Sequence, residues 1–145
     1  MHYIDNWYSL LYRILISDID PEIAKEAITV ELCAGIVDKS GKSLEQIARE
    51  EVEEECGFRT KSIECIQTFR SSIGTGGQNM TLFYAEVSEE DRVSAGGGLP
   101  QEGELIEVVE LPLDQIKQFL GQSCVNSPSF TLYGLQWFLA NKNSK

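Results

Sequence analysis

The sequence predicts one α+β (α/β) sandwich, in which a mixed β-sheet is flanked by helices. Stretches rich in β-branched residues are interspersed with three stretches that carry helix-capping signals. A chain of 145 residues is long enough for one hydrophobic core and too short for two ordinary ones. Its apolar fraction of 42% is normal for a globular protein, so disorder is not the default expectation.

Five stretches have the composition of β-strands. They are residues 10–17, 27–33, 62–72, 80–87 and 105–111, and Ile36–Val37 could prolong the second. Residues 74–77 (Gly-Thr-Gly-Gly) predict a turn between the third and fourth strands. Three glycines at 96–98 lead toward the fifth strand and predict a mobile loop.

Three helices are predicted between and after these strands. The first spans Ser43–Cys56, with Ser43 as N-cap, Gln46 completing a capping box and Gly57 as the left-handed residue that ends it. The second spans Leu113–Leu120. The third runs to about Ala140, with Ser127 as cap and Pro128 at its first helical position.

The charge of the chain excludes several classes of function. A net charge of −11 argues against a nucleic-acid partner and fits carboxylates that hold a divalent cation. The single histidine, His2, leaves neither a Ser-His-Asp or Cys-His centre nor a His-ligated zinc site. Four scattered cysteines predict reduced thiols. The absence of a signal peptide pattern and of a long apolar run predicts a cytoplasmic protein that does not bind membranes.

The first predicted helix carries the most specific pattern. Its apolar stripe of Leu44, Ile47 and Ala48 continues at helical spacing into Glu51, Glu54 and Glu55. Like charges at this spacing repel, and partial burial strengthens the repulsion. A bound Mg²⁺ or Mn²⁺ would relieve it, which favours a metal site. The alternative is a solvated acidic face, the usual role of a charge run.

These residues resemble the Nudix hydrolase motif, G-x5-E-x7-R-E-U-x-E-E-x-G-U, in which U is bulky and apolar. Gly35 matches its first glycine, and residues 51–58 (Glu-Val-Glu-Glu-Glu-Cys-Gly-Phe) match its end without a gap. The loop after Gly35 is one residue longer. Lys42 stands at the family's loop glutamate and Glu50 at its arginine, so the two could still pair; Arg49 and Glu45 offer a shifted pair.

Residues 28–139 are similar to the UDP-sugar diphosphatase (UDP-glucose pyrophosphatase) branch, which is related to ADP-ribose pyrophosphatases. The similarity rests on residues 30–38, 54–57, 96–98 and 102–109. It implies hydrolysis of UDP-glucose to UMP and glucose 1-phosphate with Mg²⁺, for which Mn²⁺ can substitute. The implied metal ligands are Ala34 or Gly35 through a carbonyl, Glu51, Glu54, Glu55 and Glu104. The implied catalytic residues are Glu102, as general base, and Glu55; the roles of Glu102 and Glu104 could also be exchanged. The candidate substrate contacts are Ser71, Ser72, Thr75 and Gln78.

The organisation expected from this resemblance is an irregular segment 1–27 followed by a Nudix domain 28–141. The leading region does not look like that of the family, so an N-terminally shortened sandwich is expected. Two alternatives stay open: an ADP-ribose pyrophosphatase, and a truncated Nudix-fold module that binds nucleotide or protein with little activity. A homodimer is a further expectation that the resemblance implies.

Overall fold

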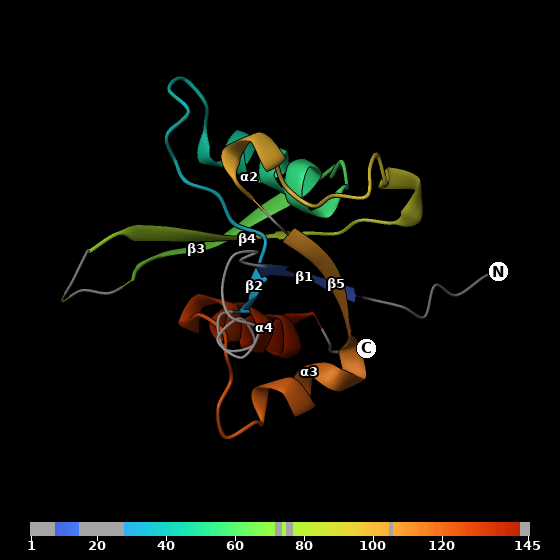
Figure 1. Cartoon of the computed structure of the whole chain (residues 1–145). Coiled ribbons are helices and arrows are strands. Elements are labelled where there is room, and N and C mark those ends of the chain that lie inside the picture. The colour runs from blue at the N-terminus through green and yellow to red at the C-terminus, as the bar shows by residue number, and fades with distance from the viewer. Residues whose placement is uncertain (1–7, 15–27, 72–73, 75–76, 105, 143–145) are drawn as a thin grey trace. The chain divides into compact units, whose positions relative to one another are not determined.

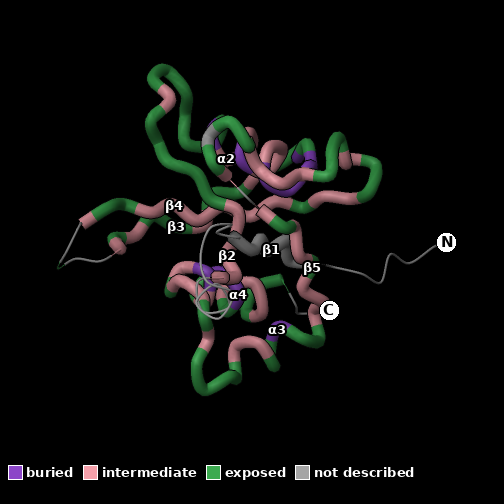
Figure 2. The backbone as a smooth tube through the Cα atoms, viewed as in Figure 1, coloured by how far each residue is buried: buried purple, intermediate pink, exposed green. Residues whose placement is uncertain are grey.

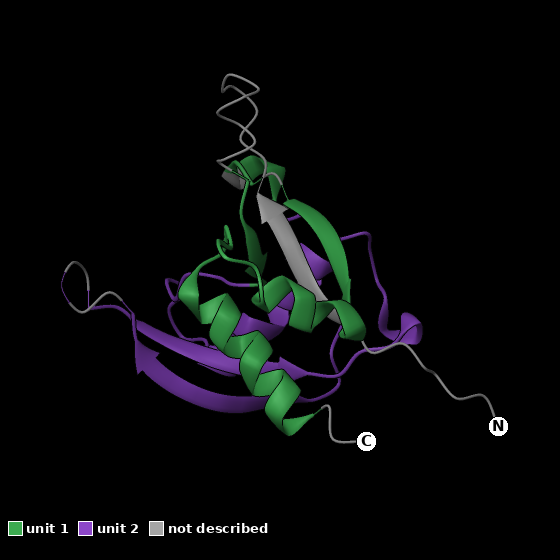
Figure 3. Cartoon of the chain, turned by 90° about the horizontal axis from the view of Figure 1, so that it is seen from below, with its two compact units in different colours: residues 1–33, 99–145 green, residues 34–98 purple. Residues whose placement is uncertain are grey.

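The computed structural model describes residues 8–14, 28–71, 74, 77–104 and 106–142, with only the backbone for 8–14 and 102. Its chain divides into two compact units, each described here by itself (Figure 3). Unit 1 contains residues 1–33 and 99–145, and unit 2 contains residues 34–98. Helices and strands occur in both units, as expected for an α+β fold.

The described strands of unit 1 form an antiparallel sheet in the order β2-β1-β5 (Figure 1). They are β1 (Tyr8–Ile14), β2 (Val30–Leu32) and β5 (Ile106–Pro112). Strand β1 pairs Leu11 with both Leu32 of β2 and Val109 of β5, which fixes the register. All three strands were predicted, although residues 15–17, 27 and 105 lie outside the described residues. Because β1 falls within 1–27, this segment contributes a strand to the sheet; the boundary at residue 27 stays a prediction.

Helices α3 (Leu113–Leu120) and α4 (Ser129–Asn141) complete unit 1, and both contain buried positions (Figure 2). Among the described residues, Ile116 of α3 and Leu135 of α4 are buried. Helix α3 has the predicted bounds. Helix α4 contacts β2, and the Leu32 N–H donates to Oγ1 of the fully buried Thr131 at 3.3 Å. The predicted start of α4 was wrong. Pro128 is the N-cap, because the Ser127 hydroxyl donates to the Val30 carbonyl instead of capping the helix.

Unit 2 contains the antiparallel hairpin of β3 (Ile63–Arg70) and β4 (Asn79–Ala85). Both strands were predicted, and a register shift between Cys65 and Gln67 marks an irregularity in β3. Helix α2 (Leu44–Glu51) contacts both strands and continues directly into η1 (Val52–Cys56). The suggested continuation of the second strand through Ile36–Val37 was wrong, because these residues lie in an exposed loop.

Two short 3₁₀ turns complete the described elements: η2 (Glu89–Asp91) in unit 2 and η3 (Pro100–Glu102) in unit 1. Cys56, Cys65 and Cys124 are free thiols, in agreement with the predicted reduced state. Within the part of the chain that the structure describes, no helix is both long and apolar enough to cross a lipid bilayer.

Candidate metal and active site

The helix that carries the predicted metal ligands begins with the predicted cap. The Ser43 hydroxyl accepts the Gln46 N–H at 3.2 Å, and the Gln46 side chain accepts the Ser43 N–H at 2.8 Å. This reciprocal pair satisfies two of the amide donors that every helix N-terminus leaves unpaired. Ile47, one turn further on, is 3% exposed and anchors the apolar face of α2.

The C-terminal part of this helix differs from the prediction. Residues 52–56 form a π-helical turn, η1, and not the last turn of an α-helix. Gly57 ends it in the left-handed conformation (φ 79°), and its N–H donates to the carbonyls of Val52 and Glu53. A π-turn has wider i→i+5 hydrogen bonding and is rare in proteins. The extent of the helix was therefore predicted correctly, but the geometry of its last turn was not.

The glycines at 96–98 pack against this helix end. The Gly97 N–H donates to the Glu55 carbonyl at 2.9 Å, and the Gly98 N–H donates to the Glu54 carbonyl at 3.1 Å. A Cβ on Gly96 would overlap the Glu55 carbonyl oxygen and lie 2.7 Å from the carbonyl carbon of Cys56. All three glycines have positive φ. These glycines allow a close, hydrogen-bonded approach to the residues that bear the carboxylates, and the mobility expected of this loop stays a prediction.

Two of the three predicted metal-binding carboxylates are buried. Glu51 is 9% exposed and Glu55 is 2% exposed, so a solvated acidic face does not describe them. Oε2 of Glu55 accepts the Ala34 N–H at 3.0 Å. Gly35, the next residue, lies so close to the Glu51 carboxylate that a Cβ would overlap it. The turn at Ala34–Gly35 and the end of the helix thus meet, as the motif implied.

Lys39 is a site residue that the sequence reasoning missed. Its Nζ donates to Oε2 of Glu50 at 3.3 Å and lies 3.6 Å from Oε1 of Glu51 and 3.8 Å from Oε2 of Glu54. Burial lowers the pKa of Lys39, but the hydrogen bond to Glu50 and the charges of Glu54 and Glu51 outweigh it and hold that pKa above its ordinary value. The one available signal was a basic residue in the loop between Gly35 and the helix.

The reversed charges of the motif form the expected ion pair. Nζ of Lys42 lies 2.6 Å from Oε1 and 2.7 Å from Oε2 of Glu50, and this hydrogen bonding holds the pKa of Glu50 below its ordinary value. The shifted pair forms as well, with Arg49 donating to Glu45 at 2.9 Å. Arg49 also donates to the Thr60 carbonyl at 2.8 Å. The two pairs coexist.

The residues present fit a hard divalent cation. Carboxylate oxygens of Glu51 and Glu54 already face a cationic group, the Lys39 ammonium, and oxygen donors are those that Mg²⁺ and Mn²⁺ prefer. No group of three or more acidic, cysteine or histidine side chains among the described residues has metal-binding geometry as it stands. A cation bound between these carboxylates would therefore require their side chains to rearrange.

The remaining predicted site residues fall into two groups. Ser71 and Gln78 close the β3-β4 hairpin, where the Ser71 N–H donates to the Gln78 carbonyl at 2.9 Å; Ser72 and Thr75 lie outside the described residues. Glu102 lies in η3, and Oε2 of Glu104 accepts the Leu99 N–H at 2.7 Å. Both glutamates belong to unit 1, and their assigned roles stay predictions.

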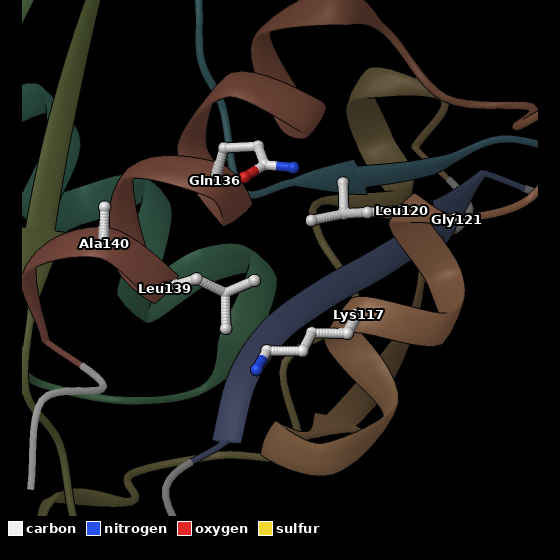
Figure 4. Close-up of a pocket in the computed structure, with 6 residues that line it drawn as sticks. All are labelled: Lys117, Leu120, Gly121, Gln136, Leu139 and Ala140. Atoms are coloured by element: carbon white, nitrogen blue, oxygen red, sulfur yellow. The ribbon is translucent and has the colours of Figure 1, made fainter.

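A pocket of about 440 Å³ lies in unit 1 between α3 and α4 (Figure 4). Lys117, Leu120 and Gly121 line it on one side, and Gln136, Leu139 and Ala140 on the other. It is lined by one basic residue and no carboxylate, so it offers no anionic oxygen ligand for a divalent cation.

Comparison with known proteins agrees with the metal and active site proposed at the end of helix α2. No family model matches the chain. The chain is similar to the uridine diphosphate glucose pyrophosphatases NUDT14 of Bos taurus and Mus musculus, with 44% and 42% identity over 115 residues, 78% of this chain and 52% of each relative. A GDP-mannose pyrophosphatase of Cronobacter sakazakii is 30% identical over 74% of the chain and 54% of its own length. The chain spans about half the length of the curated relatives it matches.

The fold also matches a solved structure described as an ADP compounds hydrolase. The TM-score is 0.64 at 19% identity, and the match covers 97% of this chain and 70% of the other. At this level of identity the match shows the fold alone, which is of the α+β type. The chain belongs to the Nudix hydrolase family, with the UDP-glucose pyrophosphatases among its relatives.

Proposed function

We propose that this protein hydrolyses the pyrophosphate bond of nucleoside diphosphate sugars in a Mg²⁺-dependent reaction, and that it converts UDP-glucose to UMP and glucose 1-phosphate. The observation that carries the proposal is the set of helix carboxylates held against the Ala34–Gly35 turn, with two of them facing a cationic group. The names of the two NUDT14 relatives support the substrate. A cytoplasmic location and a homodimer are part of the proposal.

The division of labour follows from the chemistry of the side chains. A divalent cation at this site would neutralise charge on the pyrophosphate and lower the pKa of a bound water. Glu51, Glu54 and Glu55, helped by a carbonyl of Ala34 or Gly35, would hold and orient it. Glu102 would accept the proton of the attacking water, with Glu104 as a further oxygen ligand. Contacts to the substrate are proposed for Ser71, Ser72, Thr75 and Gln78.

The substrate proposal is tested by comparing UDP-glucose, GDP-mannose and ADP-ribose with Mg²⁺ and following UMP, GMP or AMP by chromatography. We expect the highest kcat/KM for UDP-glucose. A clear preference for ADP-ribose would reassign the substrate while keeping the chemistry, and no hydrolysis of any of the three would refute the proposed reaction.

The roles of the two loop glutamates are tested separately from substrate choice. Glu102→Gln should lower kcat by roughly 10²–10⁴-fold, the usual contribution of general-base catalysis, and leave Mn²⁺ affinity nearly unchanged. Glu104→Gln should weaken Mn²⁺ binding. If Glu102→Gln loses metal affinity as badly as Glu51→Gln does, Glu102 is a ligand and the division is wrong.

A second candidate is a module that binds a nucleotide or a protein and hydrolyses slowly or not at all. The observation that favours it is that, within the described residues, no three acidic side chains stand ready at metal-binding geometry. Titration of UDP-glucose alongside a turnover assay separates the two functions. Saturable binding without release of UMP at any Mg²⁺ concentration would favour the module.

A further inference from the structure

We propose that Lys39 is a tethered cation that neutralises the helix carboxylates until a divalent cation displaces it, so that this lysine lowers the affinity of the site for metal. The inference rests on the proposed function, because it requires that the same carboxylates bind a divalent cation. It adds a determinant of metal affinity that belongs to the loop and lies outside the glutamate motif.

The position of the ammonium carries the proposal. Lys39 Nζ lies between 3.3 and 3.8 Å from one carboxylate oxygen each of Glu50, Glu51 and Glu54. Two of these three, Glu51 and Glu54, are proposed metal ligands. The Lys39 side chain is 32% exposed, so its flexible stem can swing toward solvent without unpacking a core.

Lys42 provides a matched comparison within the same loop. Its side chain forms an ion pair with Glu50 at 2.6 Å, but no ion pair between Lys42 and Glu51, Glu54 or Glu55 occurs in this part of the structure. Both lysines carry the same charge and lie three residues apart in the loop, so they differ mainly in which carboxylates they contact. Of these two lysines, Lys39 is the one whose charge lies against the proposed metal ligands.

Competition follows from the size and charge of the two cations. Mg²⁺ binds carboxylate oxygens at about 2.0–2.1 Å and therefore needs the space between them that the ammonium now faces. A dication and an ammonium also repel each other across such a short distance. Without either cation, like-charged glutamates at helical spacing destabilise the helix. The lysine can therefore support the metal-free fold and still oppose metal binding.

The test is a Mn²⁺ titration of metal-free protein, in which electron paramagnetic resonance measures the free Mn²⁺. It is carried out on the wild type and three variants. We expect Lys39→Met to bind Mn²⁺ roughly threefold to tenfold more tightly, since surface ion pairs are individually weak. The Mn²⁺ affinity of Lys42→Met should stay within about twofold of that of the wild type. Lys39→Arg keeps the positive charge, so its Mn²⁺ affinity should also resemble that of the wild type. Lys39→Gln replaces Lys39→Met if the apolar side chain prevents folding.

Thermal unfolding provides a second readout. Lys39→Met should have a lower Tm than the wild type in chelator, and saturating Mn²⁺ should abolish the difference. Unchanged or weaker Mn²⁺ binding by Lys39→Met, or an equal gain in Lys42→Met, would overturn the proposal.

The proposed reaction is judged independently on the same wild-type sample by UMP release from UDP-glucose. If the wild type releases UMP and Lys39→Met binds Mn²⁺ with unchanged affinity, only the proposed role of Lys39 is refuted. Absence of both turnover and Mn²⁺ binding in the wild type refutes both proposals.

Discussion

The ammonium of Lys42 lies within hydrogen-bonding distance of both carboxylate oxygens of Glu50, at 2.6 and 2.7 Å. The Nudix motif places the acid in the loop and the base on the helix, and this chain places them the other way round. The contact between the loop and α2 is therefore compatible with either polarity, provided that the two signs remain opposite.

Reversing this pair one residue at a time should destabilise unit 2. Lys42→Glu and Glu50→Arg each create like charges, and we expect a Tm lower by roughly 2–5 °C. Glu50→Arg should have the larger effect, because Glu50 also accepts a hydrogen bond from Lys39. The double variant should recover most of the loss from Lys42→Glu. A double-mutant cycle by calorimetry measures the coupling, and strict additivity would show that the pair contributes nothing.

Glu55→Gln should remove most of the Mg²⁺-dependent turnover while preserving the fold. The amide oxygen of glutamine can still accept the Ala34 N–H, and one of several repelling charges is lost. In chelator the variant should be as stable as the wild type or slightly more stable. Turnover of UDP-glucose checks the loss of activity, and thermal unfolding in the metal-free state checks the stability. A fully active variant would refute the role of Glu55.

Gly96→Ala should destabilise the protein more than Gly41→Ala. Both glycines have positive φ, at 70° and 85°, but a Cβ at Gly41 meets nothing within 4 Å. The left-handed conformation alone costs about 1–2 kcal/mol for alanine, and we expect that for Gly41→Ala. At Gly96 backbone atoms of η1 must also move, so we expect at least about 3 kcal/mol in urea unfolding. Equal losses would show that the close approach has little energetic weight.

The dependence of stability on acid should include a contribution from Asp91. The Lys61 ammonium at 2.6 Å, together with the N–H and hydroxyl of Ser88, lowers the pKa of Asp91 from 3.8 to about 2. Because the pKa is lower in the folded state, the stabilisation is complete above about pH 4 and disappears as the pH falls through about 2. Asp91→Asn should therefore be less stable than the wild type at pH 5–7, and the difference in Tm should close toward pH 2.

Local signals in the sequence predicted the elements that position the site. The capping box of Ser43 and Gln46, the left-handed Gly57 and the Lys42–Glu50 pair all occur as expected. Each depends on residues close together in the chain or on a fixed motif spacing. The strands were also predicted from a local signal, because their residue types favour a half-buried sheet surface whichever strands they pair with.

The features that the sequence did not predict depend on contacts between distant segments. Lys39 has a long side chain in a loop, and its direction is set by where the helix carboxylates lie. Ser127 satisfies an ordinary N-cap pattern, yet its hydroxyl binds the carbonyl of Val30, 97 residues away. The close packing of the glycines at 96–98 against the helix end depends on contacts with residues about 40 positions earlier in the chain, so only the fold reveals it.

The π-turn of η1 has a consequence for how this segment can change its length. A π-turn holds one residue more than an α-helical turn, so η1 could lose one residue and close as an α-helical turn without rotating the segment after it relative to α2. Substitutions within η1 should be tolerated when the new side chain matches the old one in size and charge. Residues 53–55 are all glutamates, so the extra residue of the π-turn can be lost without removing a carboxylate only at Val52 or Cys56.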